Sequence, residues 1–282
     1  MDTYSVVIPT YNGECYIEQT LLSALNQKRA FDEIIVSDDN STDRTLDICY
    51  NYNNKIKIFK NENGPSGFVN GWNNAIAKAT GDYVSILHQD DLLDASFLLK
   101  MAKLCENNPD VLHLFSTCNY LDEKGKVTGV SFPATDEMVR YSGLEYVKAY
   151  QNLGNLHIHR VPGVITHRSI FEKIQYHPQA GHIADDDFFY RVGMFTDVIG
   201  ILKPLASYRI HNQSETGKLD DGKLVKRLID DYSFQVKQWK HSDFLDEEAY
   251  NFFIRNLKKF KKRYLGYGIK QLDLSKIIYA LK

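Results

Sequence analysis

The sequence lacks any apolar run long enough to cross a membrane, since no stretch approaches the roughly 18 uninterrupted apolar residues that a transmembrane helix needs. Residues 1–4 lead into a strand-like segment, without the basic leader or apolar core of a signal peptide. We therefore expect a cytoplasmic protein, associated at most peripherally with the inner face of the plasma membrane.

Cysteine is scarce, and the four cysteines are far apart in the sequence: Cys15, Cys49, Cys105 and Cys118. None of them forms a C-x-x-C pair, which argues against a zinc knuckle or a dithiol redox motif. Isolated cysteines of this kind fit reduced thiols in a cytoplasm.

An excess of charge of one sign is also missing, because the formal net charge is only −2. Nothing in this balance calls for a nucleic-acid partner, and we expect none. Proline is sparse, with seven residues, and no low-complexity run occurs, so the 282 residues suit one large or two small globular domains.

Strand and helix patterns alternate along the first hundred residues. Predicted strands comprise residues 4–9, 33–37, 55–60 and 82–87, and predicted helices comprise residues 17–26, 43–52, 68–79 and 95–106. Ser41 or Thr42 is expected near the N-cap of the second helix. Strands that alternate with helices of this length predict an α/β fold with parallel pairing through right-handed crossovers.

The pattern loosens after Pro109, which divides the chain into three predicted regions. Residues 111–117 suggest a strand, residues 122–126 a hairpin turn, and the chain becomes helical and charged from about residue 220. We therefore expect one sheet domain in two halves, residues 1–108 and 109–215, followed by a helical tail, residues 216–282.

Polar segments follow three of the predicted strands. They are Thr10-Tyr11-Asn12, Asp38-Asp39-Asn40-Ser41 and His88-Gln89-Asp90-Asp91. In parallel sheets, ligands bind beyond the carboxyl ends of the strands, so these segments predict a binding site.

Asp90 and Asp91 form an acidic pair after an apolar strand. Adjacent carboxylates there repel each other unless a cation is present, and Mg²⁺ or Mn²⁺ is a suitable partner, above all with a diphosphate. The alternative is that one of them caps the following helix.

Asp38 and Asp39 form a second acidic pair, in which a carboxylate can accept hydrogen bonds from a ribose hydroxyl or a base N–H. The alternative is again a helix cap. A phosphotransferase with Asp38 as nucleophile would be another class of enzyme, but its D-x-D-x-[TV] spacing is absent.

Two later segments also carry functional groups. Asp185-Asp186-Asp187 opens an aromatic helix, where the carboxylates either complement the helix dipole or supply a general base for a hydroxyl group. In Tyr208-Arg209-Ile210-His211, the cation and the imidazole could hold a diphosphate and its metal, although isolated residues of these types are usually structural.

Together these segments resemble family 2 glycosyltransferases with the GT-A fold. The opening motifs are residues 5–12 and 33–43, residues 79–83 lead into a counterpart of the D-x-D metal motif at 88–91, and residues 185–191 and 208–211 are similar to the later motifs. All of them occur in the expected order between residues 4 and 211.

The resemblance implies a Rossmann-like, mostly parallel sheet flanked by helices, with a C-terminal helical extension. It also implies inverting transfer of a sugar from a nucleoside-diphosphate donor, UDP-linked above all, to a hydroxyl of a glycan or lipid-linked acceptor. Mn²⁺ or Mg²⁺ would be the cofactor, and the role would lie in surface polysaccharide or glycoconjugate synthesis.

Carried over by position, the resemblance makes Asp185 the catalytic base, with Asp186 as the substitute. It implies that Asp90, Asp91 and His211 are the metal ligands. The remaining residues that it places at the nucleotide sugar are Pro9, Thr10, Tyr11, Asn12, Asp38, Asp39, Gly67, Asn73, His88, Gln89, Gly163 and Arg209.

Two departures from the family pattern concern the choice of donor. His88 stands where the D-x-D motif begins with an acid, and residues 64–70 lack the arginine that many members carry. Two other functions remain as alternatives. A sugar nucleotidyltransferase should open with a glycine-rich loop, whereas residues 9–13 contain one glycine; a non-catalytic glycan-binding protein would not need the full acidic set.

The helical tail contains a basic segment in which Lys258, Lys259, Lys261, Lys262 and Arg263 alternate with aromatic residues. Such a helix can bind an anionic membrane surface. A solvated face above a packed apolar stripe explains the same pattern.

Overall fold

The computed structural model describes residues 2–135, 137–152, 158–212, 221–271 and 274–281. The chain divides into two compact units. The first comprises Met1–Tyr176 and Arg191–Ile210, and the second comprises His177–Tyr190 and His211–Lys282. The three-region division at residues 108 and 215 stays a prediction.

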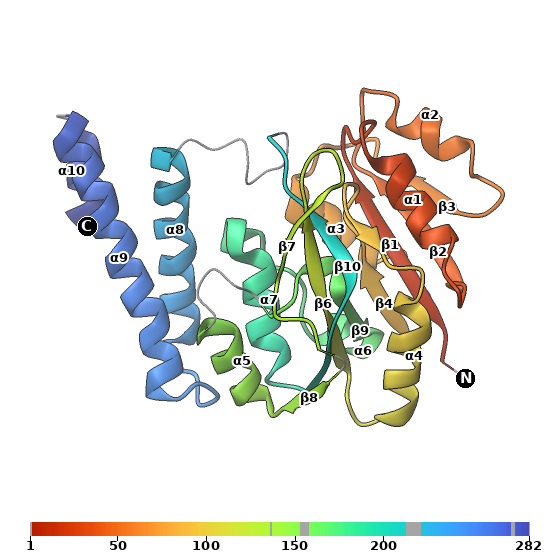
Figure 1. The fold of residues 1–282 in the computed structure, drawn as a ribbon. Coiled ribbons are helices and arrows are strands. Elements are labelled where there is room, and N and C mark those ends of the chain that lie inside the picture. The colour runs from red at the N-terminus through yellow and green to blue at the C-terminus, as the bar shows by residue number, and fades with distance from the viewer. Residues whose placement is uncertain (1, 136, 153–157, 213–220, 272–273, 282) are drawn as a thin grey trace. The chain divides into compact units, whose positions relative to one another are not determined.

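The described residues of the first unit form a ten-stranded sheet, in which eight strands have the order β3-β2-β1-β4-β9-β6-β10-β5 (Figure 1). Off this path, β7 pairs with β6 and β8 pairs with β10. The strands are β1 (Tyr4–Thr10), β2 (Glu33–Asp38), β3 (Lys57–Lys60), β4 (Tyr83–Ile86), β5 (Leu92–Leu93), β6 (His113–Leu121), β7 (Val127–Val130), β8 (Met138–Tyr141), β9 (Val164–His167) and β10 (Val198–Arg209). The first four strands confirm the α/β pattern of the sequence.

Parallel pairing brings the carboxyl ends of several strands to one edge of the sheet. Strand β1 pairs in parallel with β2, up to the partners Thr10 and Asp38, and also in parallel with β4. Strand β9 is antiparallel to both β4 and β6, so β6 and its parallel neighbour β10 run in the same direction as β4.

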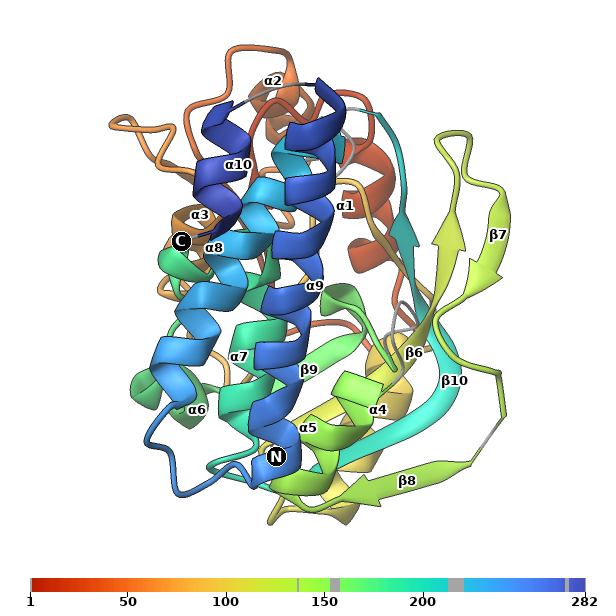
Figure 2. The same cartoon turned by 90° about the vertical axis from the view of Figure 1, so that its left-hand side faces the viewer.

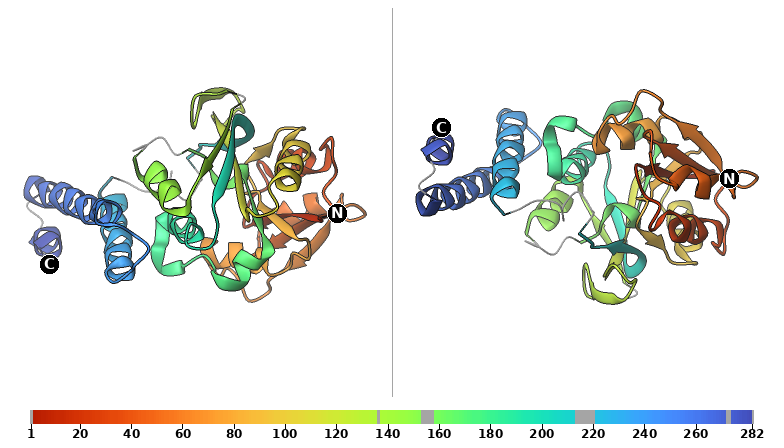
Figure 3. Two further views of the ribbon diagram at one scale, coloured as in Figure 1. Left: turned by 90° about the horizontal axis from the view of Figure 1, so that it is seen from below. Right: turned by 90° about the horizontal axis from the view of Figure 1, so that it is seen from above.

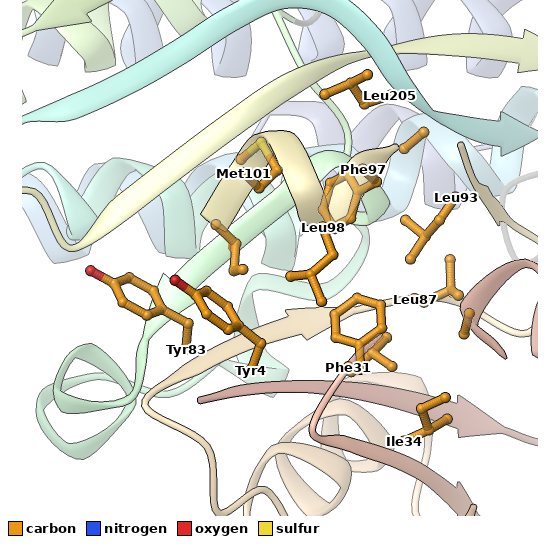
Figure 4. Packing of buried hydrophobic residues seen from close by; sticks show 14 of the residues in the cluster. Tyr4, Phe31, Ile34, Tyr83, Leu87, Leu93, Phe97, Leu98, Met101 and Leu205 are labelled. Carbon is orange, nitrogen blue, oxygen red and sulfur yellow. The ribbon is translucent and has the colours of Figure 1, made fainter. Parts of the chain in front are cut away.

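Helices cover both faces of this sheet (Figure 3). In the first unit they are α1 (Ile17–Leu25), α2 (Thr45–Tyr50), α3 (Phe68–Ile76), α4 (Phe97–Asn107), α5 (Gly143–Asn152), the short η1 (Val161–Gly163) and α6 (Arg168–Lys173). Helices α1, α2 and α4 pack into one core with alternate residues of β1 and β2, and Phe97, Leu98 and Met101 lie near Tyr4 within it (Figure 4). Helix α3 contacts β1, β2 and β4.

The expected N-cap of the second helix is wrong. Helix α2 starts at Thr45, and its N-cap residue Arg44 makes no side-chain capping bond. Instead, Asp43 accepts a hydrogen bond from Thr45 N at 3.0 Å, and Ser41 bonds to Asp38. Ser41 does not cap α2 because its hydroxyl group donates a hydrogen bond to the buried carboxylate of Asp38.

The second unit is helical (Figure 2). It contains η2 (Pro178–Ile183), most of α7 (Ala184–Val192), α8 (Asp221–Trp239), α9 (Glu247–Gln271) and α10 (Leu274–Leu281). Helix α9 packs against both α8 and α10, around Val225, Ile229 and Tyr264. The predicted C-terminal helical extension is therefore confirmed.

Candidate active site

Asp38 joins the loops that follow β1 and β2. Its side chain is fully buried and accepts hydrogen bonds from Thr10 Oγ1 at 3.0 Å, Ser41 N at 2.9 Å and Ser41 Oγ at 2.5 Å. Both carboxylate oxygens of Asp38 accept hydrogen bonds within the protein, so Asp38 fixes the loops at this edge of the sheet.

Asp39 holds the next loop. Its carboxylate accepts hydrogen bonds from Asn61 Nδ2 at 2.7 Å and from Ser66 N at 2.6 Å, and it keeps 7% of its surface exposed. Gly64 allows the loop to approach, since a Cβ there would lie 2.5 Å from Asp39 O. Asp39 thus fixes the segment that leads into Gly67 and α3.

Asn12 locks the turn after β1 onto the turn after β2. Its backbone N donates to Ser41 Oγ at 2.9 Å, and its Oδ1 accepts from Thr42 N at 2.8 Å. Asn12 has a φ of 50° and Asn40 a φ of 70°, a region that asparagine tolerates better than most residues. Tyr11 is left 42% exposed at this edge.

Gln89 connects the loop after β4 with the loop after β1. It accepts from Tyr11 N at 2.8 Å and donates to Tyr11 O at 3.1 Å. Gly13 leaves room for this side chain, because a Cβ at this position would come within 2.4 Å of Gln89 Oε1 and displace it. The three predicted polar segments are therefore brought together by direct hydrogen bonds.

Asp91 is a buried carboxylate. Its Oδ1 accepts from Arg209 N at 2.9 Å, while Oδ2 accepts no hydrogen bond from the described residues and lies 3.5 Å from His88 Nδ1. Burial raises the pKa of Asp91 to about 6, and His88 opposes this rise. Neither Asp90 nor Asp91 caps α4, whose N-cap residue is Ser96.

Arg209 holds the acidic loop, residues 88–91, in place. Its Nε donates to Asp90 O at 2.8 Å, and one terminal nitrogen donates to Gln19 Oε1 at 2.9 Å. Its guanidinium also lies 4.5 Å from the centre of the Tyr16 ring. Only 2% of Arg209 is exposed, so the structure uses this cation to hold the position of Asp90.

His88 stacks on Trp72, with ring centres 4.9 Å apart, and Trp72 also contacts Tyr176 edge-on. Asn73 exchanges two hydrogen bonds with the backbone of Tyr176, at 2.9 and 3.0 Å. Sequence reasoning missed Trp72, because a tryptophan inside a helical pattern suggests core packing. Trp72 follows Phe68 by four residues, and this spacing indicated that the two rings lie on one helix face, where they contact edge-on.

Gly163 packs against β6. A Cβ at this position would lie 2.7 Å from Ser116 O and 2.9 Å from Cys118 Sγ. The close approach that this glycine permits is therefore to the neighbouring strand.

Three residues predicted from the later motifs, Asp185, Asp186 and His211, lie in the second unit, whereas Arg209 belongs to the first. Asp185 and Asp186 are half-buried in the first turn of α7, and His211 is partly buried. Asp187 is fully buried and accepts hydrogen bonds from Gln235 Nε2 and Gln238 Nε2, both at 2.8 Å. Asp187 therefore ties α7 to α8.

The loop after β4 suits a metal that is bound together with substrate. No group of three or more His, Cys, Asp or Glu side chains placed to hold a metal occurs in the described part of the chain. Mg²⁺ is commonly held by one or two carboxylates plus substrate phosphates, and the buried Asp91 Oδ2 without a hydrogen bond fits a nearby cation.

Residues 5–175 match the model of the family described as glycosyl transferase family 2. A Campylobacter jejuni protein named GalNAc(5)-diNAcBac-PP-undecaprenol beta-1,3-glucosyltransferase is 34% identical over 132 residues, which are 45% of this chain and 41% of the relative. The poly(ribitol-phosphate) beta-N-acetylglucosaminyltransferase TarS of Staphylococcus aureus is 37% identical over 118 residues, 40% of this chain and 20% of the relative. The chain therefore matches less than half the length of these two relatives.

Among solved structures, S. aureus TarS 1-349 in complex with UDP-GlcNAc superposes with a TM-score of 0.65 at 19% identity. The match covers 99% of this chain and 89% of that one. At this identity the likeness concerns the fold alone, and it confirms the expected GT-A architecture.

Proposed function

The chain belongs to glycosyl transferase family 2, and on this premise we propose that it transfers a sugar from a nucleoside-diphosphate donor to an acceptor hydroxyl. The observation that carries the proposal is the joining of three polar loops at the carboxyl ends of β1, β2 and β4. Such an edge is where parallel α/β sheets bind nucleotides.

The donor is proposed to be a UDP-sugar. Thr10, Tyr11 and Asp39 are assigned to the nucleoside, because they stand at the ends of β1 and β2, and the exposed Tyr11 ring offers a stacking surface. The superposed TarS structure holds UDP-GlcNAc, which supports this choice of nucleotide. The sugar itself is left to experiment.

The acceptor is proposed to be a glycan or a lipid-linked glycan. The C. jejuni relative is named for a PP-undecaprenol-linked acceptor and the S. aureus relative for poly(ribitol-phosphate). Surface polysaccharide or glycoconjugate synthesis is the role that this comparison favours.

The proposed reaction is an in-line displacement with inversion. The carboxylate of Asp185 takes the proton of the acceptor hydroxyl, whose oxygen forms a bond to the anomeric carbon as the bond to the diphosphate breaks. Asp186 is the substitute base. Both residues are assigned from the family motif at 185–191, in which Asp187 has the separate structural task described above.

Asp90 and Asp91, with His211 by family resemblance, are proposed to hold Mn²⁺ or Mg²⁺. When bound, the ion would neutralise charge on the departing diphosphate. The chain itself positions this loop: Arg209 fixes the backbone of Asp90, and the single hydroxyl proton of Thr20 is shared between Gln89 O and Asp91 O, each 2.9 Å from Oγ1.

A donor screen tests this function. UDP, GDP and their sugar derivatives are added with Mn²⁺, and the melting temperature and the release of nucleoside diphosphate are measured. We expect one UDP-sugar to stabilise the protein and to be hydrolysed slowly. Binding without turnover in the presence of candidate glycan acceptors would favour the non-catalytic alternative, and pyrophosphate release from a nucleoside triphosphate with a sugar phosphate would favour a nucleotidyltransferase.

Attachment to a membrane is proposed for α9. Arg255, Lys258, Lys259, Lys262 and Arg263 are exposed along this helix. Within the described residues, no helix has the length and apolar character of a membrane span. We propose a cytoplasmic protein bound peripherally to anionic lipid at the inner face of the plasma membrane; co-sedimentation with phosphatidylglycerol vesicles tests it, and equal binding to neutral vesicles would contradict it.

A further inference from the structure

Arg160 is a partly buried cation that lies among tyrosine rings just before η1. Its guanidinium carbon is 5.6 Å from the ring centre of Tyr120 on β6 and 5.3 Å from that of Tyr208 on β10. Tyr150 on α5 is also close enough to act on it electrostatically. The aromatic faces attract the cation and restrict its movement.

Few of the hydrogen-bond donors of Arg160 are used by the residues that the structure describes. A guanidinium has five N–H groups, yet the one side-chain hydrogen bond of Arg160 to a described residue is a long one, 3.4 Å from a terminal nitrogen to Tyr120 Oη. Its Nε is buried and donates to no atom of the described residues. No carboxylate of the described residues pairs with it.

Two other arginines of the first unit differ from Arg160 in their hydrogen-bond and ion-pair partners. Arg209 is also buried, but it donates to Asp90 O, Gln19 Oε1 and Asp122 O. Arg140 is exposed and forms ion pairs with Asp110 and Asp197 at 2.7 and 2.8 Å. A cation taken out of water without a counter-ion costs free energy, so the surroundings of Arg160 suit an incoming anion.

The position of Arg160 relates it to the acidic loop. Tyr120 and Tyr208 are next to the last residues of β6 and β10, which end at the same edge of the sheet as β4. Burial raises the pKa of the Cys118 thiol, and the charge of Asp91 adds to this rise while the charge of Arg160 opposes it. Arg160 therefore lies on the binding edge, near the loop that carries Asp90.

We propose that Arg160 binds a phosphate group of the acceptor substrate. The planar guanidinium can give two parallel hydrogen bonds to phosphate oxygens, and the tyrosine rings keep the fork oriented. The proposal rests on the proposed transferase function, which it deepens by naming a chemical group of the acceptor.

The order of the strands favours the acceptor over the donor as the source of the phosphate. The nucleoside residues follow β1 and β2, and Asp90 follows β4, the neighbour of β1. Arg160 lies beside β6 and β10, on the other side of β4 from β1 and β2. A phosphate at Arg160 therefore lies beyond Asp90 as seen from the nucleoside.

The test measures two affinities separately by calorimetry. One titration uses UDP with Mn²⁺, and the other uses glycerol 3-phosphate added to protein already saturated with UDP and Mn²⁺. For R160Q we expect glycerol 3-phosphate to bind at least tenfold more weakly, because a charge-assisted hydrogen-bonded pair is lost. The affinity for UDP should change less than twofold. R160K should be intermediate, since it keeps the charge and loses the fork.

R140Q is the matched control, because it removes an exposed arginine of the same unit that already has carboxylate partners. It should leave both affinities within twofold of the wild type. A loss of UDP affinity in R160Q would assign the phosphate to the donor and overturn the acceptor assignment. Unchanged binding of glycerol 3-phosphate in folded R160Q, or no saturable binding to the wild type, would overturn the proposal itself.

The melting temperatures of R160Q and R160K show whether each variant is folded. If R160Q does not fold, the conservative variant R160K still tests the proposal. Both titrations measure binding alone, so neither requires sugar transfer. Arginine-dependent phosphate binding without any sugar transfer would contradict the proposed function and leave the site of Arg160 standing.

Discussion

The acidic pairs of the first unit and the acidic cluster of the second unit share one arrangement. In each, one carboxylate is fully buried and bonded to distant residues, as are Asp38, Asp91 and Asp187. The neighbouring acid keeps some contact with solvent. The units differ in what the buried acid holds: in the first unit it fixes loops beyond a sheet, whereas in the second it joins two helices.

This comparison shows how adjacent acids divide structural and chemical tasks. A buried carboxylate must be hydrogen-bonded to offset its desolvation, so it fixes the backbone on both sides of itself. The adjoining residue is then held in place through the backbone, and Asp39 also uses its own oxygens to bind Asn61 and Ser66. The predictions below separate the two kinds of acid, from the largest expected effect to the smallest.

Replacing the proposed base should have the largest effect. In D185N the amide cannot accept the proton of the acceptor hydroxyl, so kcat should fall about 10³-fold. The affinity for UDP with Mn²⁺, measured by calorimetry, should stay within twofold. D186N is the matched variant and should retain most activity; if D185N were fully active and D186N inactive, the two roles would be exchanged.

Removing the charge of Asp90 should lower activity about 10²-fold, because the proposed metal would lose a ligand. Steady-state assays across a range of Mn²⁺ concentrations should show a higher Mn²⁺ requirement for D90N. D39N is the comparison from the other strand end, and there the affinity for UDP should weaken while the Mn²⁺ requirement is unchanged. A D90N enzyme with the wild-type Mn²⁺ dependence would contradict the assignment.

The second unit should lose stability as the pH rises from about 4 to 7. Burial raises the pKa of Asp231 to about 7, the charge of Asp230 acts in the same direction, and His182 N and Arg227 oppose the rise. Since the folded state binds this proton more tightly than the unfolded state, the neutral carboxyl is favoured below the folded pKa. The free energy of unfolding should fall by about 3 kcal/mol over this range.

D231N separates this contribution from those of other titrating groups. The variant and the wild type should have similar stability near pH 4, and the variant should be increasingly more stable up to pH 7. Urea unfolding at several pH values, followed by the fluorescence of Trp239 in a W72F background, measures the difference. Parallel stability curves for the two proteins would disprove the shift in pKa.

Breaking the contact between α7 and α8 should have the smallest of these effects. In D187N, one oxygen that accepts from Gln235 and Gln238 can be replaced by an amide that donates, which should cost about 2 kcal/mol of stability. Trp239 reports on it directly, because its Nε1 donates to Gln235 Oε1 at 2.9 Å. D186N, at the half-buried neighbour, should change stability by less than about 0.5 kcal/mol.

Much of the sheet could be predicted from local pattern. The β-branched runs that became β1, β2 and β4 are buried on both faces, and such runs are recognised without tertiary information. Strands β5, β8 and β9 were not predicted, since they are two or four residues long and are defined mainly by their antiparallel partners.

The sequence by itself determined the family, the parallel strands of the first hundred residues and the edge where polar loops meet, because short motifs and strand periodicity are local properties. Only the tertiary structure decided which acid of each cluster is buried and which arginine has hydrogen-bond donors to spare. The diphosphate contact of Arg209 stays a prediction, and the structure adds that its Nε donates to Asp90 O, while Arg160 carried no signal in the sequence. Burial and hydrogen-bond partners come from residues far apart in the chain, and these partners set what a charged side chain can do.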